Sequence, residues 1–299
     1  MPHVDAEMAA PIAMGAGGLV ETAYAKVNLA LHVRHRRADG YHALESLFVF
    51  AEHGDLVSGH SRQDGVLDLQ LQGPFGPALD SGGDNLVLKA ARALQAFIGE
   101  ERGASLVLTK YLPVASGIGG GSADAAAVLR LLTRLWNVAI GQAALGRIAL
   151  SVGSDVPACL SSVTQMVQGR GELLERRTVE GLDGAPMLLV NPGLGVSTAR
   201  VFAGWDQVDR GPLDARNMEQ LIIDGRNDLE AAAIIEAPVV AEVLAVLKSC
   251  AGVRMTRMSG SGATCFALFD TESHRASAAV AVRGAHPGWW VAETRIRAA

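Results

Sequence analysis

Hydrophobic and polar residues alternate between residues 21 and 33, near the start of the chain. Alternate residues of a strand project from the same face, so this pattern predicts a strand with one hydrophobic and one more polar face. A basic turn follows, and then a second predicted strand at residues 44–50. The hydrophobic face of the first strand would consist of Ala25, Val27, Leu29, Leu31 and Val33, and the other face of Lys26, Asn28, Ala30 and His32.

Hydrophobic residues that recur every three or four positions predict several helices farther along the chain. Asp84 is expected to cap a helix that carries Leu86, Ala90, Leu94 and Phe97. Further helices are expected up to residue 136, at 142–151, 238–249 and 272–283, with short ones near residues 198 and 217. Strands are expected at 104–110, 163–168, 187–190, 253–257, 264–269 and 289–296. This mixed order predicts an α+β fold in both halves.

The segment 181–186, rich in glycine and ending in proline, is the most linker-like part of the chain. We therefore expect two domains. The first would span residues 21–180 and bind ATP, as argued below, and the second would span 187–299 and contribute to substrate binding. Residues 1–20 are expected to form a disordered extension, because they are rich in Ala, Gly, Met and Pro. They do not predict a signal peptide, since Asp5 and Glu7 stand where basic residues would be expected and the hydrophobic run is broken.

The bulk composition of the 299 residues narrows the class of protein. Hydrophobic residues make up 49% and charged residues 19%, which is typical of a globular protein. A net charge of −5 argues against a general role in nucleic-acid binding, and no hydrophobic run approaches the length of a membrane span. The three cysteines, Cys159, Cys250 and Cys265, are far apart in hydrophobic surroundings. We expect buried free thiols and a cytoplasmic protein.

A glycine-rich loop at residues 113–122 is the strongest sign of chemistry. Four glycines stand between residues 117 and 121, directly before a strong helix-forming sequence. Glycine allows the backbone to come close to a ligand, and a helix N-terminus offers unpaired N–H groups and the positive end of its dipole. Together these features favour a phosphate-binding site. Because no Gly-Lys-Ser/Thr follows, the loop is not a Walker A loop, and it falls one residue short of the dinucleotide fingerprint. The alternative is a plain glycine-rich turn before a packed helix.

Lys26 and Asp155 are the candidate catalytic residues. Lys26 lies in the middle of the first predicted strand, where it is either a solvated side chain or a cation that serves the phosphate loop. Asp155 precedes Pro157, so it either caps the next helix or acts as a general base toward a hydroxyl. A lysine beside that carboxylate would keep it ionised.

Two further motifs allow both a structural and a functional interpretation. Tyr41 and His42 follow a turn, and they either pack at a hairpin end or offer a stacking ring and an imidazole to a flat heterocycle. Residues 259–263, Ser-Gly-Ser-Gly-Ala, form either a hairpin turn or a second loop that supports the first.

Three of these motifs, at residues 25–29, 113–127 and 259–263, stand in the order found in one enzyme superfamily. The chain resembles the superfamily of galactokinase, homoserine kinase, mevalonate kinase and phosphomevalonate kinase. Residues 37–42, 84–86, 153–157 and 192–202 resemble more closely its member that phosphorylates a cytidine-diphospho sugar alcohol in isoprenoid precursor synthesis. The resemblance implies an α+β kinase with a ribosomal-protein-S5-like N-terminal domain and a ferredoxin-like C-terminal domain. Ala115 and Ser116 stand where some members have further glycines, which predicts a stiffer loop.

The resemblance also implies roles for individual residues. Lys26 and Asp155 would be catalytic, and ATP would be the phosphoryl donor, with Mg²⁺ held largely by ATP and water and Ser122 as a candidate ligand. The expected ATP site consists of Asn85, Leu86, Lys110, Pro113, Ser116, Gly117, Gly119, Gly120, Gly121 and Ser122. The expected substrate site consists of Asn28, Tyr41, His42, Thr198, Phe202, Gly260 and Gly262.

Alternative functions remain open at this point. A homoserine or mevalonate type of kinase would have no use for an aromatic clamp at Tyr41, His42 and Phe202. A nucleotide-binding regulator would not need both Lys26 and Asp155. A dinucleotide dehydrogenase would need its glycine loop at the first strand–helix turn. The expected partner is a small molecule, with neither nucleic acid nor membrane, and the chain is expected to be a monomer or a weak homodimer.

Overall fold

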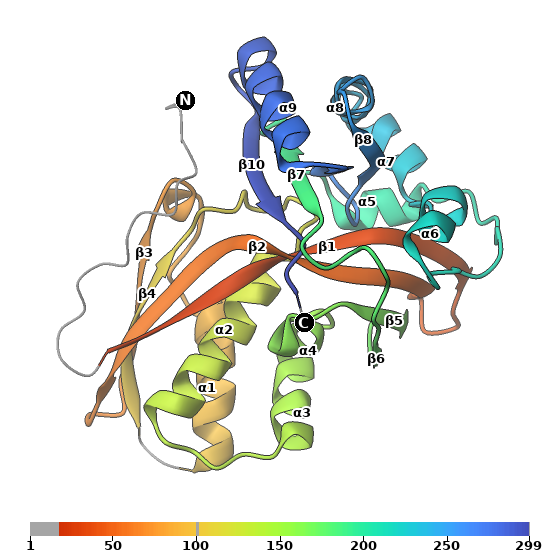
Figure 1. Cartoon of the computed structure of the whole chain (residues 1–299). Coiled ribbons are helices and arrows are strands. Elements are labelled where there is room, and N and C mark those ends of the chain that lie inside the picture. The colour runs from red at the N-terminus through yellow and green to blue at the C-terminus, as the bar shows by residue number, and fades with distance from the viewer. Residues whose placement is uncertain (1–17, 100–101, 299) are drawn as a thin grey trace.

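The computed structural model describes residues 18–99 and 102–298, and its strands form two separate sheets (Figure 1). Most of the expected N-terminal extension lies outside the described residues, although Leu19 and Val20 already belong to the first strand. Both halves of the chain contain runs of strands and runs of helices, and the sheets are mainly antiparallel. The predicted α+β class is therefore confirmed.

The N-terminal sheet has six strands. Its central feature is an antiparallel pair of long strands, β1 (Leu19–Arg36) and β2 (His42–Arg62), which cross the width of the molecule (Figure 1). The order β3-β4-β2-β5-β6 runs through β2, with β1 paired to β2 as well. The other strands are β3 (Leu67–Gln72), β4 (Gly103–Thr109), β5 (Gln165–Gly169) and β6 (Leu173–Arg176).

Four helices cover one face of this sheet, below β1 and β2 in Figure 1. They are α1 (Leu86–Ile98), α2 (Gly120–Leu135), α3 (Gln142–Val152) and α4 (Val156–Ser161). Helix α2 is central, since it packs against α1, α4 and β1, and its buried face is rich in alanine. Small side chains allow the close packing of these elements, so the start of α2 is held firmly beneath β1.

The C-terminal sheet has four strands in the order β10-β7-β9-β8, all antiparallel. This order, with β9 between β7 and β8, is that of the expected ferredoxin-like domain. The strands are β7 (Pro186–Asn191), β8 (Val253–Met258), β9 (Cys265–Phe269) and β10 (Trp290–Arg295). The helices are α5 (Thr198–Ala203), α6 (Met218–Asp224), α7 (Glu230–Glu236), α8 (Val239–Lys248) and α9 (Glu272–Ala285).

The two halves meet along β1. The N–H of Leu31 donates to the carbonyl of Arg226, and the N–H of Asp228 donates to the carbonyl of Leu31. The buried Asp228 carboxylate accepts from the N–H of Val33 at 2.8 Å and from Arg226 at 2.8 Å. Residues 25–33 of β1 are buried on both faces, and Lys26, predicted to lie on a partly polar face, is only 5% exposed.

Several elements differ from the sequence-based expectations. The cap of α1 is Asn85, whose side chain accepts from the N–H of Val87, and not Asp84. Strands β3 and β6 and helix α7 were not predicted. Strand β6 and helix α7 are short. Strand β3 alternates Leu67, Leu69 and Leu71 with polar residues, a strand pattern that the sequence analysis overlooked. Cys159 and Cys265 are buried free thiols as expected, whereas Cys250 is half-buried.

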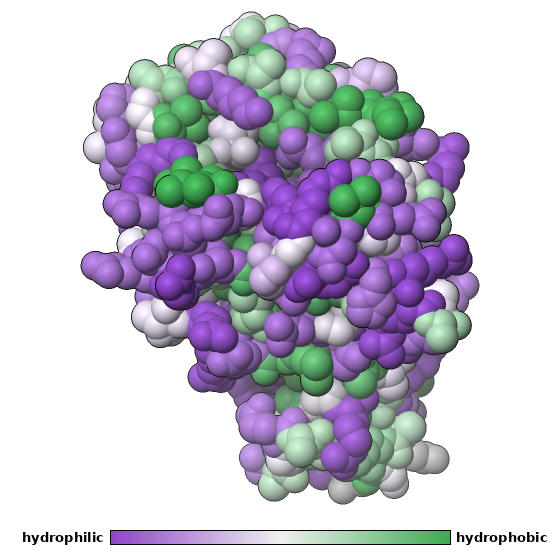
Figure 2. Space-filling view, turned by 90° about the vertical axis from the view of Figure 1, so that its right-hand side faces the viewer, coloured by the Kyte–Doolittle hydropathy of each residue, from purple (hydrophilic) through white to green (hydrophobic). Residues whose placement is uncertain are grey.

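Hydrophilic residues predominate on the face shown in Figure 2, and hydrophobic ones form small groups among them. Within residues 18–99 and 102–298, none of the helices combines the length and hydrophobicity that crossing a membrane requires.

Candidate active site

A cavity of about 1190 Å³ lies between the two halves of the chain. Its walls come from β1 and β2, the glycine loop, the starts of α1, α2 and α4, helix α5, and the turn after β8. Every residue that the sequence analysis placed in the ATP, substrate or catalytic sets lines this cavity except Gly262. Segments that are far apart in the sequence therefore meet here.

Strand β1 contributes Lys26 and Asn28, but not His32. The pairing of β1 with β2 shifts between Asn28 and Ala30, where Leu29 is an extra residue on β1. Such a bulge reverses the alternation of side chains beyond it. Leu31 consequently lines the cavity, whereas His32 is buried against Gly211 and Arg226. The prediction that His32 shares a face with Lys26 is wrong for this reason.

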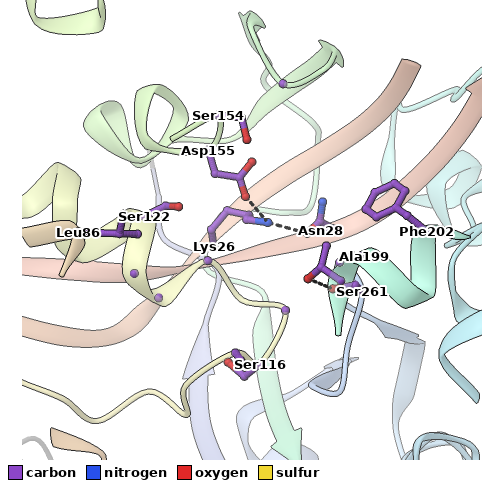
Figure 3. Close-up of a pocket in the computed structure, with 18 of the residues that line it drawn as sticks. Lys26, Asn28, Leu86, Ser116, Ser122, Ser154, Asp155, Ala199, Phe202 and Ser261 are labelled. Atoms are coloured by element: carbon purple, nitrogen blue, oxygen red, sulfur yellow. Dashed lines mark hydrogen bonds and ion pairs between the residues drawn. The ribbon is translucent and has the colours of Figure 1, made fainter. Parts of the chain in front are cut away.

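Lys26 and Asp155 meet at the centre of the cavity (Figure 3). Their Nζ and Oδ2 atoms are 3.2 Å apart, and Nζ also donates to Oδ1 of Asn28 at 2.9 Å. The ring of Phe48 lies 4.4 Å from the ammonium. The Lys26 side chain is 6% exposed and that of Asp155 is 32% exposed. The cation is thus fixed by its surroundings, while the carboxylate remains accessible to a ligand.

Asp155 stands at the N-cap position of α4, yet its side chain makes no capping hydrogen bond. Its carboxylate faces Lys26 instead (Figure 3). A residue placed only to stabilise the helix would accept from an N–H of the first turn. The geometry therefore favours a role of Asp155 as a general base over a role as a helix cap.

The glycine loop ends directly at the N-terminus of α2, beside Lys26. Gly117 and Gly119 have φ values of +79° and +62°, and Gly119 is the N-cap of the helix. A Cβ on Gly119 would lie 2.9 Å from Cε of Lys26. Ala115 also has a positive φ, 52°, which is an uncommon conformation for a residue with a side chain. The unpaired N–H groups of the first turn of α2, near Ser122, open into the cavity.

The second glycine turn packs directly on the first. A Cβ on Gly117 would lie 2.5 Å from the carbonyl oxygen of Ser259 and 2.7 Å from that of Gly262, so the two backbones touch. The Ser259 hydroxyl donates to the carbonyl of Gly117 at 3.0 Å and accepts from the N–H of Asn28 at 3.0 Å. Gly260 faces the cavity, but Gly262 faces Met258 and Gly117. Gly262 therefore supports the loop from behind.

Lys110 lines the cavity floor beneath α2, where its ammonium is paired with two buried carboxylates, Asp55 and Asp124. Burial lowers the pKa of Lys110, but the charges of both carboxylates outweigh that effect and raise it. Burial raises the pKa of Asp124 well above its usual value. Asp55 also accepts from the N–H groups of Tyr111 and Leu112. This cluster anchors the strand before the glycine loop to α2, and a nucleoside contact by Lys110 stays a prediction.

Aromatic side chains form the opposite end of the cavity. The His42 ring is 5.0 Å from that of Phe202 and 5.6 Å from that of Trp205, measured between centroids. Burial, and then the nearby Arg36, lower the pKa of His42, which favours its neutral form. Tyr41 is 58% exposed at the rim. The hydroxyl groups of Thr198 and Ser261 form a hydrogen bond, with their oxygen atoms 2.9 Å apart.

Figure 3 shows Leu86 and Ser122 on one side of Lys26, and Asn28 and Phe202 on the other. Of the expected ATP-binding residues, Leu86 and Ser122 thus lie on the opposite side of Lys26 from Asn28 and Phe202, which belong to the expected substrate site. The residues that line the cavity and were not predicted include Trp205, Ser261 and Arg170. Ser261 lies within the 259–263 motif, whereas no local sequence pattern indicated that Arg170 or Trp205 would line the cavity.

The fold and this cavity define an ATP-dependent small-molecule kinase. Residues 85–162 match the family described as "GHMP kinases N terminal domain", and residues 211–287 match "GHMP kinases C terminal". The chain is 50% identical to a 4-diphosphocytidyl-2-C-methyl-D-erythritol kinase of Rhizorhabdus wittichii, over 93% of this chain and 94% of that relative. A relative of the same name from Sphingopyxis alaskensis is 45% identical over 93% and 98% of the two chains. The chain belongs to the family of 4-diphosphocytidyl-2-C-methyl-D-erythritol kinases.

Solved structures agree with this assignment. A crystal structure of 4-(cytidine 5'-diphospho)-2C-methyl-D-erythritol kinase is similar with a TM-score of 0.78 and 32% identity, covering 93% of this chain and 99% of that one. A homoserine kinase from Cytophaga hutchinsonii is similar with a TM-score of 0.73 at 16% identity, covering 96% and 98%. The second likeness shows a shared fold alone.

Proposed function

We propose that this chain transfers the γ-phosphoryl group of ATP to the 2-hydroxyl of 4-diphosphocytidyl-2-C-methyl-D-erythritol, in the non-mevalonate route to isoprenoid precursors. One observation carries the proposal: the Lys26–Asp155 pair lies in a single cavity between a helix N-terminus and an aromatic cluster. Such a cavity has a place for a triphosphate on one side and for a flat base on the other. Relatives at 45–50% identity bear the name of this enzyme.

The donor phosphates would bind at the start of α2. The glycine loop brings backbone N–H groups to the cavity surface without side chains in the way, and the helix dipole adds partial positive charge. Asn85 and Leu86 at the start of α1 border the same end, where the nucleoside would lie. In phosphoryl transfer the protein chiefly positions the reactants and neutralises charge, which this arrangement provides.

Mg²⁺ prefers oxygen ligands and is usually shared among phosphate oxygens, water and one or two protein groups. Among the residues that the structure describes, no cluster of three or more His, Cys, Asp or Glu could hold a metal ion. The Ser122 hydroxyl, in the first turn of α2, lines the cavity. This donor set fits a Mg²⁺ held mainly by ATP, with Ser122 as a protein ligand. When bound, the ion would neutralise charge on the phosphates.

Asp155 would act on the acceptor hydroxyl. Its exposed carboxylate oxygen would accept the hydroxyl proton or orient that hydroxyl toward the γ-phosphorus, a role worth about 10²–10⁴-fold in rate. Lys26 keeps the carboxylate in place and would stabilise the negative charge that develops on the transferred group. Asn28 holds the Lys26 ammonium through its Oδ1 atom and lies at the acceptor side of the pair.

The aromatic end would recognise the cytosine. Phe202 and Tyr41 would stack on the base, and a neutral His42 can donate and accept hydrogen bonds along the edge of an uncharged heterocycle. Thr198 and Gly260 would line the path between the base and the acceptor hydroxyl. We further propose that residues 21–180 form the ATP-binding domain and residues 187–299 the second domain, and that the chain acts in the cytoplasm as a monomer or weak homodimer.

A coupled assay of ADP release, run with three acceptors, tests the proposal. The cytidine-diphospho substrate should be phosphorylated, whereas homoserine and mevalonate should give no ADP above background. Identification of the product by ³¹P NMR should show a new phosphomonoester next to an intact diphosphate. Turnover of homoserine or mevalonate instead of the cytidine compound would contradict the proposal, and so would ADP release without any acceptor dependence.

A further inference from the structure

Arg170 lies on the turn between β5 and β6, at the rim of the cavity. Strand β5 pairs with the beginning of β2, and Gly169 is opposite Leu44. This pairing brings the turn beside Tyr41, the residue before β2. The sequence separates Tyr41 from Arg170 by more than a hundred residues, so only the sheet places them together.

The Arg170 guanidinium lies over the Tyr41 ring, with Cζ 4.3 Å from the ring centroid. Its Nη1 atom is 3.8 Å from a carboxylate oxygen of Asp39. The other carboxylate oxygen of Asp39 accepts from the N–H of Tyr41 at 3.1 Å. Asp39 thus holds both the backbone of the tyrosine and the cation that covers its ring.

A flat ring has two faces, and the guanidinium occupies one face of Tyr41. The ring is nevertheless 58% exposed and lines the cavity, so it has surface left for a second planar group. A cation stacked on a tyrosine favours one orientation of an otherwise mobile side chain. Without Arg170, the exposed ring would be free to rotate away from the cavity, and a base would have to immobilise it at a cost in rotamer entropy.

We propose that Arg170 is a positioning residue for the nucleobase site: it covers the outer face of Tyr41 and so orients the inner face toward the cytosine. This inference rests on the proposed function, because it assumes that Tyr41 stacks on the base. It differs from a direct contact between the Arg170 cation and the diphosphate of the substrate. The two roles are separated by whether the effect of Arg170 depends on Tyr41.

A double-mutant cycle with CDP as the probe makes this distinction. In the wild-type chain, Arg170→Ala should weaken CDP binding about two- to fivefold in isothermal titration calorimetry, the size expected for an exposed cation–π contact. In a Tyr41→Ala background the same substitution should have no further effect. Arg170→Lys should lose less affinity than Arg170→Ala, because the cation remains while the planar stack is lost.

Steady-state kinetics and a matched control complete the test. Arg170→Ala should raise the KM for the cytidine substrate by the same two- to fivefold factor by which it weakens CDP binding. It should leave kcat, the KM for ATP and the Tm unchanged. Arg177→Ala removes a half-exposed arginine that is paired with Glu175 outside the cavity, and should change none of these quantities. An equal loss of CDP affinity in the Tyr41 and Tyr41→Ala backgrounds would overturn the inference, and so would no loss in either. Absence of CDP binding by the wild-type chain would overturn the proposed function itself.

Discussion

The aliphatic part of Lys26 packs against Gly119, the N-cap residue of α2. A Cβ at position 119 would be 2.9 Å from Cε of Lys26, closer than real Cβ atoms pack, and 3.1 Å from Cβ of Lys26, which is a tight contact. The absence of a side chain at Gly119 therefore allows Lys26, the proposed catalytic cation, and the N-terminus of α2, the proposed phosphate site, to lie next to each other.

Gly119→Ala should reduce kcat by at least tenfold, because Lys26 must move away from Asp155 and from the donor phosphates. The positive φ of +62° adds a cost of roughly 1–2 kcal/mol in the free energy of unfolding. Gly141→Ala is the matched control, since Gly141 is the N-cap of α3 outside the cavity and an added Cβ there would meet no atom within 4 Å. Steady-state assays and urea unfolding of both variants check this. Equal activity of the two variants would show that the contact with Lys26 is unimportant.

The Lys110 cluster should matter for stability. Lys110→Met would leave Asp55 and Asp124 buried without their cation, at a cost of about 3–5 kcal/mol in the free energy of unfolding. Asp124→Asn should cost less, because burial already disfavours the charged form of that carboxyl, whose pKa is raised. Urea denaturation at pH 7 measures both values. A larger loss in Asp124→Asn than in Lys110→Met would contradict this description of the cluster.

Phe202→Ala should act mainly on substrate binding. Stacking of a base on an aromatic ring is worth roughly 1–3 kcal/mol, so the KM for the cytidine substrate should rise about five- to 150-fold. The KM for ATP should not change, because Phe202 lies on the other side of Lys26 from Leu86 and Ser122. Phe97→Ala, at an exposed phenylalanine of α1 outside the cavity, is the control. An unchanged KM for the cytidine substrate in Phe202→Ala would show that Phe202 does not stack on the base.

His32 should make the fold sensitive to acid. It is fully buried, accepts from the N–H of Arg226 at 3.3 Å, and contacts the carbonyl of Gly211 at 3.3 Å through Nδ1. Burial, and then the charge of Arg226, lower its pKa below 6.5. The unfolded chain therefore binds more protons than the folded chain just below pH 6.5, and stability falls as the pH falls through that window.

The slope from one such group is at most about 1.4 kcal/mol per pH unit. Urea denaturation between pH 7.5 and 5 should show this loss of stability, and His32→Gln should make the dependence shallower. His35→Gln, at an exposed histidine of the same strand, should leave the slope as it is. A slope that is equal in the wild-type chain and in His32→Gln would exclude His32 as the source.

Local sequence patterns predicted most of the fold. They failed where the direction or the contacts of a side chain depend on pairing between elements that are distant in the sequence. The alternation in residues 21–33 identified β1, but a bulge at Leu29 that depends on pairing with β2 reversed the direction of His32. The glycine loop and α2 followed from the sequence, since positive φ and helix start are local properties. Arg170 could not be predicted, because its contact with Tyr41 exists only through the β2–β5 pairing. The pairing of Lys110 with Asp55 and Asp124 likewise needs three elements.

The most direct test of the account is single-turnover phosphoryl transfer by Asp155→Asn, with ATP and cytidine-substrate affinities measured in parallel. Transfer should slow by about 10²–10⁴-fold, while both affinities and the free energy of unfolding stay close to those of the wild-type chain. Transfer at a rate near that of the wild-type chain would show that the carboxylate beside Lys26 does not act on the acceptor hydroxyl.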